Sequence, residues 1–131
     1  MNYQPALVQL PLVKETRNEL VRTPEDARRI CEDITQLAQE TFQVLSLNTR
    51  NMLICRHMST LGIVNASLIH PREVFRTAIE NSATSVVLIH NHCSGNLTPS
   101  LEDIKITKQL INAGNIIDIR VLDHVIVGKR S

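Results

Sequence analysis

The chain has 131 residues, a length that suits one domain with its own hydrophobic core. Apolar residues make up 43% of the chain, which is ordinary for a globular protein. The net charge of +1 argues against strong attraction to nucleic acid or to a membrane surface. One tyrosine, two phenylalanines and no tryptophan leave little for base stacking and predict an aliphatic core. No secretory signal, membrane-spanning run or disulfide framework is visible, so we expect a cytoplasmic protein.

The first part of the chain divides into a predicted arm and a predicted domain. Residues 1–22 contain short apolar pieces broken by two prolines, which favour an N-terminal arm or an edge strand. Residues 23–131 are predicted to form the domain. Its first helix should begin at Thr23 and Pro24, because threonine caps helices and proline suits their first position. Apolar residues recur at helical spacing up to Ala38.

The apolar period then changes to two, which is typical of strands. The pattern predicts a strand over residues 42–47 and a turn over 48–51. A second strand of the same hairpin is predicted over 52–65, with Gly62 at a bulge.

Further helices and strands alternate toward the C-terminus. A second helix is expected from Pro71, and the continuous apolar run SVVLI at 85–89 predicts a buried central strand. A polar loop follows over 91–99. A third helix should run from Ser100 to near Gly114, with a last strand within 116–127. The alternation indicates an α/β sandwich.

The buried strand is followed by His90-Asn91-His92. Strand side chains alternate, so the two histidines point to one side and can bind one metal ion. Asp103 follows in the first turn of the next helix, where the loop can bring its carboxylate to the same point. Two imidazoles and a carboxylate leave one tetrahedral position open for an activated water, as in catalytic zinc sites. Alternatively, the histidines are unrelated loop residues, and Ser100 with Asp103 forms only a capping box.

The whole string HNHCSGNLTPSLED resembles the JAMM metalloprotease motif of the MPN (JAB) domain. The segments HPREVF, HNHCSG, TPSLED and IRVLDHVIVG closely resemble the RadC family, and the similarity runs from about Glu40 to Gly128. The resemblance implies an MPN (JAB) fold, a cytidine deaminase-like α/β sandwich with a mixed central sheet. It also implies a zinc hydrolase of the peptidase or isopeptidase type, with His90, His92 and Asp103 as ligands.

The resemblance also implies two catalytic residues. Glu40, just before a predicted strand, matches the family's general base, although it could instead be a solvated glutamate at a helix end. Glu32 and Glu73 are weaker candidates for the base. Ser100 matches the serine that helps to stabilise the oxyanion.

The remaining histidines and one cysteine are assigned lesser roles. His124 is predicted to be structural or a partner of the metal ligands, His70 to start a helix, and His57 to lie on the surface. Cys93 stands where the family usually has proline, and Asn96 where it often has an acid. The Cys93 thiol is interpreted as a tolerated substitution, with an extra zinc ligand or an oxidation target as the alternatives.

Three functions are compared. The main hypothesis is a zinc-dependent amide hydrolase acting on a peptide or protein substrate. The alternatives are a DNA-repair-associated protein acting on or near DNA, and a non-catalytic interaction module. A contiguous HNH string is not the arrangement of an HNH nuclease, and near-neutral charge disfavours direct DNA binding. A homodimer through an exposed sheet edge is a further expectation.

Overall fold

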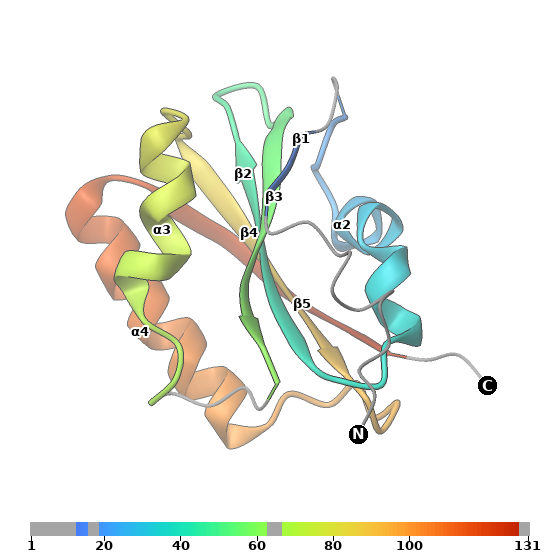
Figure 1. Cartoon of the computed structure of the whole chain (residues 1–131). Helices are drawn as coiled ribbons and strands as arrows, with labels where there is room; N and C mark the ends of the chain where they lie inside the picture. The colour runs from blue at the N-terminus through green and yellow to red at the C-terminus, as the bar shows by residue number, and fades with distance from the viewer. Residues whose placement is uncertain (1–12, 16–18, 63–66, 129–131) are drawn as a thin grey trace.

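The structure is a computed structural model of the chain, which describes residues 13–15, 19–62 and 67–128. Within these residues a mixed sheet forms the middle of three layers, with helices on both faces (Figure 1). The strands are β1 (Val13–Glu15), β2 (Thr41–Leu47), β3 (Leu53–Leu61), β4 (Ser85–His92) and β5 (Arg120–Gly128). The helices are α2 (Pro24–Ile30), the 3-10 helix η1 (Glu32–Gln36), α3 (Pro71–Glu80) and α4 (Leu101–Ile117).

The sheet has the strand order β1-β3-β2-β4-β5. β4 and β5 are parallel and the other neighbouring pairs are antiparallel, which confirms the predicted mixed α/β fold. The helices α3 and α4 cover one face, and α2 with η1 covers the other (Figure 1). Each face has its own core, one built around Phe42 and Phe75 and the other around Leu45 and Ile89. β4, which contains the SVVLI run, is therefore buried on both faces, as predicted.

The predicted hairpin is formed by β2 and β3, but the predicted bulge is elsewhere. The pairing of β2 with β3 is irregular between Phe42 and Gln43 and between Ser46 and Leu47. Gly62 instead follows the end of β3, with a φ of 107° that favours glycine. Residues 63–65 of the predicted strand lie outside the described residues.

The first helix ends earlier than its apolar spacing predicts. α2 stops at Ile30, and the chain continues as η1 rather than as an α-helix to residue 38. Arg56 of β3 donates from Nη1 to the Ile30 carbonyl oxygen at 3.2 Å and pairs with Asp33 at 2.9 Å. In a longer α-helix that carbonyl would accept the Ile34 N–H, which donates instead to the Cys31 carbonyl oxygen at 3.2 Å, so contact with the sheet favours the 3-10 continuation.

The other two helices begin where the sequence predicts. His70 is the N-cap of α3, although its side chain makes no capping hydrogen bond. α4 begins after Ser100 but continues past Gly114 to Ile117, and Asp118 ends it in the left-handed conformation with a φ of 61°. The predicted last strand is therefore shortened at its start, because residues 116 and 117 belong to the helix.

Position 114 needs a glycine because its neighbours pack closely against it, and not because α4 ends there. A methyl group at this position would overlap the carbonyl oxygen of Ile119 and lie 3.3 Å from the Phe75 ring. We expect Gly114→Ala to lower the free energy of unfolding by about 2 kcal/mol in urea titrations, despite the better helix propensity of alanine. The exposed Asn112→Ala on the same helix is the control. A gain in stability for Gly114→Ala would contradict the packing argument.

The prediction that His57 lies on the surface is wrong. His57 lies on β3 opposite Val44 of β2 and is only 3% exposed. The strand alternation that turns Arg56 toward α2 and η1 turns His57 to the opposite face, under α3. Burial lowers the pKa of His57 below its usual value, and the nearby Arg76 acts in the same direction.

The lowered pKa of His57 predicts a pH-dependent stability. As the pH falls below about 6.5, the unfolded chain gains a proton on this residue that the folded chain resists. Folding stability should therefore fall with a slope of up to about 1.4 kcal/mol per pH unit. His57→Gln should reduce this slope in urea unfolding between about pH 7 and about pH 5. The exposed His70→Gln is the control, and an equal change of slope in both variants would refute the burial argument.

The predicted arm is described only in part. β1 pairs antiparallel with β3 at the sheet edge, and Leu20 forms a single bridge to Met52. Residues 1–12 and 16–18 lie outside the described residues, and the division into arm and domain stays a prediction. In the described part of the chain, every helix is too short or too polar to cross a membrane.

Candidate metal centre

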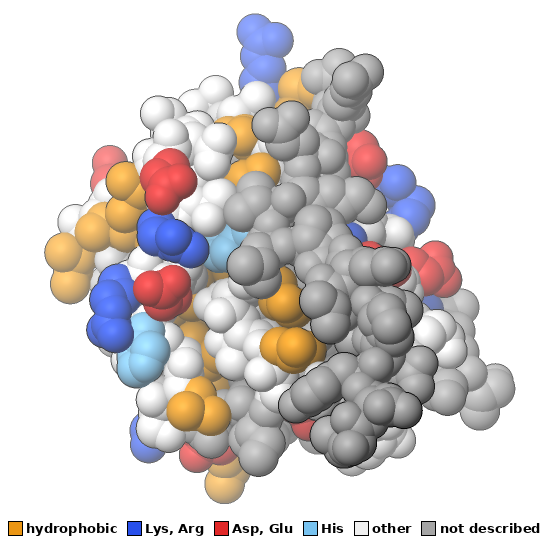
Figure 2. All heavy atoms as spheres, in the orientation of Figure 1, with side chains coloured by type: hydrophobic (Ala, Val, Ile, Leu, Met, Phe, Trp, Pro, Cys, Tyr) orange, Lys and Arg blue, Asp and Glu red, His pale blue; other side chains and the backbone are white. Residues whose placement is uncertain are grey.

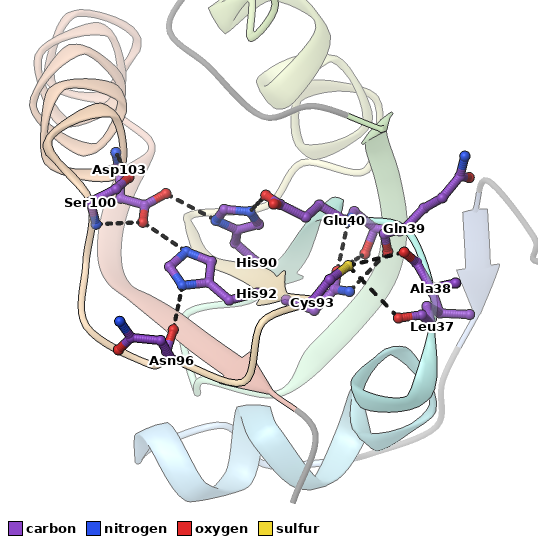
Figure 3. A network of polar contacts seen from close by, with 12 residues as sticks. Leu37, Ala38, Gln39, Glu40, His90, His92, Cys93, Asn96, Ser100 and Asp103 are labelled. Atoms are coloured by element: carbon purple, nitrogen blue, oxygen red, sulfur yellow. Dashed lines mark hydrogen bonds and ion pairs between the residues drawn. The ribbon is translucent and has the colours of Figure 1, made fainter.

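The two predicted histidine ligands lie at the C-terminal end of β4. His90 is 1% exposed and stands opposite Phe42 of β2. His92 ends the strand and is partly buried. Alternation along β4 turns both rings toward α4, and they contact edge to face with centroids 4.7 Å apart. The same-side placement predicted from the His-x-His spacing is thus present (Figure 3).

Asp103 reaches the histidines from the first turn of α4. The Ser100 hydroxyl accepts the Asp103 N–H at 3.0 Å, and the Ser100 N–H donates to Asp103 Oδ2 at 2.8 Å. The capping box therefore coexists with a position beside both imidazoles, and the carboxylate is 2% exposed. Burial tends to raise the pKa of Asp103, but the hydrogen bonds from Ser100 hold it below its usual value.

Hydrogen bonds to the outer ring nitrogens fix the tautomers of both histidines. His90 Nε2 lies 2.7 Å from Glu40 Oε1, and His92 Nδ1 lies 2.7 Å from the carbonyl oxygen of Asn96. Both partners are acceptors, so in the neutral form of each ring these are the nitrogens that carry the proton. The inner nitrogens, His90 Nδ1 and His92 Nε2, then present lone pairs.

In the neutral form of both rings, these lone pairs face the carboxylate of Asp103, which also offers only lone pairs. His90 Nδ1 lies 3.0 Å from Asp103 Oδ1, and His92 Nε2 lies 2.9 Å from Asp103 Oδ2. His90 Nδ1 and Asp103 Oδ1 are buried and form no hydrogen bond, although they are this close. One potential ligand atom from each of the three residues lies within 4.8 Å of the others. A cation would satisfy these atoms, so His90, His92 and Asp103 fit a metal ion.

Glu40 lies beside this cluster, at the residue immediately before β2. Its side chain is 37% exposed, so it stands at the opening of the site while its Oε1 contacts His90. The structure places Glu40 beside His90, whereas the alternative Glu73 is on α3 and pairs with Arg76 at 3.7 Å. Glu32 lies in η1.

Comparisons with known proteins agree with this geometry. The family profile described as "RadC-like JAB domain" matches residues 21–131. The chain belongs to this family. Similar proteins are the UPF0758 proteins of Caldanaerobacter subterraneus (48% identical over 120 residues, 91% of this chain and 52% of the relative) and of Geobacillus kaustophilus (51% over 110 residues, 83% and 49%). A UPF0758 protein of Listeria monocytogenes is 48% identical over 121 residues, or 92% and 54%. The chain thus spans about half the length of these curated relatives.

In this RadC-like JAB domain, Cys93 faces away from the metal ligands (Figure 3). Its Sγ lies 3.3 Å from the carbonyl oxygen of Ala38, to which the thiol donates. Burial, together with the charge of Glu40, raises the pKa of the thiol and keeps it protonated. The geometry gives no support to the alternative of an extra zinc ligand, because a thiolate aimed at the metal is needed for that role.

His124 of the RadC-like JAB domain supports Asp103 from behind. Its Nδ1 lies 2.5 Å from Thr107 Oγ1, which in turn donates to the Asp103 carbonyl oxygen at 2.7 Å. The His124 ring packs edge-on against the Phe42 ring, with the ring centroids 5.5 Å apart. Burial lowers the pKa of His124 to about 4, so the ring is neutral near pH 7. The structural role predicted for His124 agrees with these contacts.

Sequence reasoning missed the contacts of Thr107, the Asn96 carbonyl and Asn91. Thr107 stands four residues after Asp103, one helical turn on, which was an available signal. The partner of Asn91 is 50 residues away, at the start of β2, and no local pattern indicates it.

Proposed function

We propose that this domain is a zinc-dependent hydrolase of amide bonds, of the peptidase or isopeptidase class. The observation that carries the proposal is the meeting of three potential ligand atoms, from His90, His92 and Asp103, beside the partly exposed carboxylate of Glu40. Zinc supplies a Lewis acid that polarises a carbonyl group and lowers the pKa of water. The tetrahedral preference of zinc suits two imidazoles and one carboxylate with one open position.

Glu40 is the proposed general base. Its carboxylate lies beside the ligand cluster, with Oε1 2.7 Å from the outer ring nitrogen of His90, and we assign to it the proton taken from the attacking water. The same oxygen then delivers the proton to the nitrogen of the leaving amine. Its partial exposure leaves room for water and for a substrate group on the outer side.

Ser100 is the proposed donor to the oxyanion. Its hydroxyl oxygen accepts the Asp103 N–H, and the hydroxyl hydrogen, which also interacts with the Asp103 carboxylate, can rotate toward a substrate oxygen. The residue is exposed, so a substrate carbonyl can approach it. Capping and oxyanion stabilisation are therefore compatible for one side chain. A donor of this kind is worth about 3 kcal/mol in a site closed to water.

A groove beside the cluster offers space for a substrate chain. It has a volume of about 400 Å³ and runs between α4 and β5. Asp103 and His124 form part of its wall, and Ile104, Ile111 and Ile126 give it apolar sides. Apolar walls with few polar groups suit the side chains of a peptide better than a phosphate backbone.

The alternative functions have less support. Acidic and basic side chains are interspersed on the described part of the face in Figure 2, and the net charge is +1, so a DNA-binding role lacks the expected positive patch there. A non-catalytic module would not need the complete ligand set with Glu40. β5 is the outer strand of the described sheet, and dimerisation through its edge remains an expectation.

The test is cleavage of fluorogenic peptide libraries and of lysine-linked isopeptides by protein loaded with zinc. We expect cleavage that a chelator abolishes and added zinc restores. Zinc-loaded protein that cleaves neither kind of bond would overturn the proposal, and chelator-resistant cleavage would assign the activity to another site.

A further inference from the structure

The backbone pairing of β2 with β4 ends two residues from Glu40, the proposed base. The last paired residues are Phe42 and His90, and the next position on β4 is Asn91. Instead of bonding to backbone, the Thr41 N–H donates to the side-chain oxygen of Asn91 at 2.6 Å. Asn91 is 1% exposed, so its side chain replaces one step of the sheet inside the protein.

The Asn91 amide contacts both sequence neighbours of Glu40. Its Oδ1 accepts the Thr41 hydroxyl at 2.8 Å as well as the Thr41 N–H, and its Nδ2 donates to the Gln39 carbonyl oxygen at 3.0 Å. The Glu40 carbonyl oxygen accepts the Gly62 N–H at 2.8 Å. The backbone around Glu40 is thus held at three consecutive residues.

Strand alternation separates Asn91 from its neighbours on β4. His90 and His92 face α4, whereas Asn91 points to the opposite face, where Thr41 and Gln43 also lie. Asn91 is therefore not a metal ligand. It connects the strand that carries two ligands to the segment that carries the base.

We propose that Asn91 is a positioning residue that fixes Glu40 against His90. This inference rests on the proposed function, because Glu40 is its general base. The required geometry explains the residue type: the two Thr41 donors need an acceptor, and the Gln39 carbonyl needs a donor. An amide offers both, whereas a carboxylate lacks the donor and an alanine lacks both.

A chain of buried polar side chains also supports the segment around Glu40, starting at Thr41. The Thr41 hydroxyl accepts from Gln43 Nε2 at 3.3 Å, and Gln43 Oε1 accepts from Arg56 Nε at 2.6 Å. Arg56 is 5% exposed and makes two bonds to Asp33, at 2.9 and 3.0 Å. Each group in this chain is satisfied by the next, which is the condition under which buried polar networks rigidify a structure.

The experiment compares Asn91→Ala and Asn91→Asp with the wild type. Asn48→Ala is the matched control, because Asn48 Oδ1 also accepts two backbone N–H groups, at 2.9 and 3.0 Å, but at the far end of β2. For each protein we would measure zinc content, hydrogen exchange at the Thr41 amide, and kcat for peptide cleavage. Each variant is also made in a Glu40→Gln background.

In Asn91→Ala we expect about one zinc per chain, as in the wild type, because no ligand is changed. Exchange at Thr41 should accelerate at least about tenfold, since its acceptor is lost. kcat should fall by about 100-fold with little change in KM, and hardly at all in the Glu40→Gln background. Asn91→Asp keeps the acceptor and should restore the Thr41 protection and part of kcat. Asn48→Ala should retain the wild-type values at the site.

Several results would overturn the inference. They are an unchanged Thr41 exchange rate in Asn91→Ala, loss of zinc from that variant, or equal losses of kcat with and without Glu40. The proposed function fails separately, if zinc-loaded wild type cleaves no peptide. In that case zinc content and Thr41 exchange still decide whether Asn91 holds the segment around Glu40.

Discussion

Replacing His90 and His92 together by alanine is expected to abolish zinc binding. Protein purified without added metal should contain about one zinc ion per chain, and the double variant should contain almost none. Asp103 alone offers a single carboxylate, and both imidazole ligands are absent from the variant. Metal content measured by mass spectrometry on desalted protein checks this expectation.

Two further measurements sharpen the zinc experiment. A chelator should lower the Tm of the wild type but not that of the double variant, because only the wild type gains stability from bound metal. His70→Ala, an exposed histidine at the start of α3, is the control for losing an imidazole elsewhere. Failure of folded wild type to take up supplied zinc would refute the metal centre, and retained zinc in the double variant would place it elsewhere.

Glu40→Gln is expected to keep the zinc and lose the hydrolysis. The amide has nearly the same size and can still contact His90, so the ligand cluster stays intact. It cannot take a proton from water near pH 7, and loss of a general base costs about 10²- to 10⁴-fold in rate. kcat for a peptide cleaved by the wild type, measured beside zinc content, checks both parts.

The control for this variant is Glu73→Gln on the exposed surface of α3. Because Glu40 is partly exposed and is not in a core, its replacement should change the free energy of unfolding by less than about 0.5 kcal/mol. Full activity of Glu40→Gln would remove the residue from the mechanism. Loss of zinc from the variant would make Glu40 part of the metal centre.

The parts of the site that depend on neighbouring residues could be predicted from the sequence. The alternation that aligns His90 and His92 and the capping box that places Asp103 act within one strand and one helical turn. Glu40 could be assigned only through family resemblance, since it lies 50 residues from His90.

The errors occur where distant residues override local pattern. The first helix keeps its apolar spacing beyond Ile30, yet Arg56 of β3 takes the carbonyl that would continue it. His57 has no unusual local context, and its burial depends on α3 packing over β3. The role of Asn91 likewise needs the position of β2 beside β4. Each of these depends on tertiary contacts that period and propensity do not describe.

The three ligands all come from residues 90–103, whereas Glu40 is separated from His90 by 50 residues of chain. Closing the short loop between ligands costs little chain entropy, and bringing Glu40 to them requires β2 to be docked against β4. Folding can therefore assemble the metal-binding segment before Glu40 reaches it. If the start of β2 frayed, Glu40 would move away from His90 while the three ligands kept their places. A molecule that holds the metal is therefore not necessarily an active one.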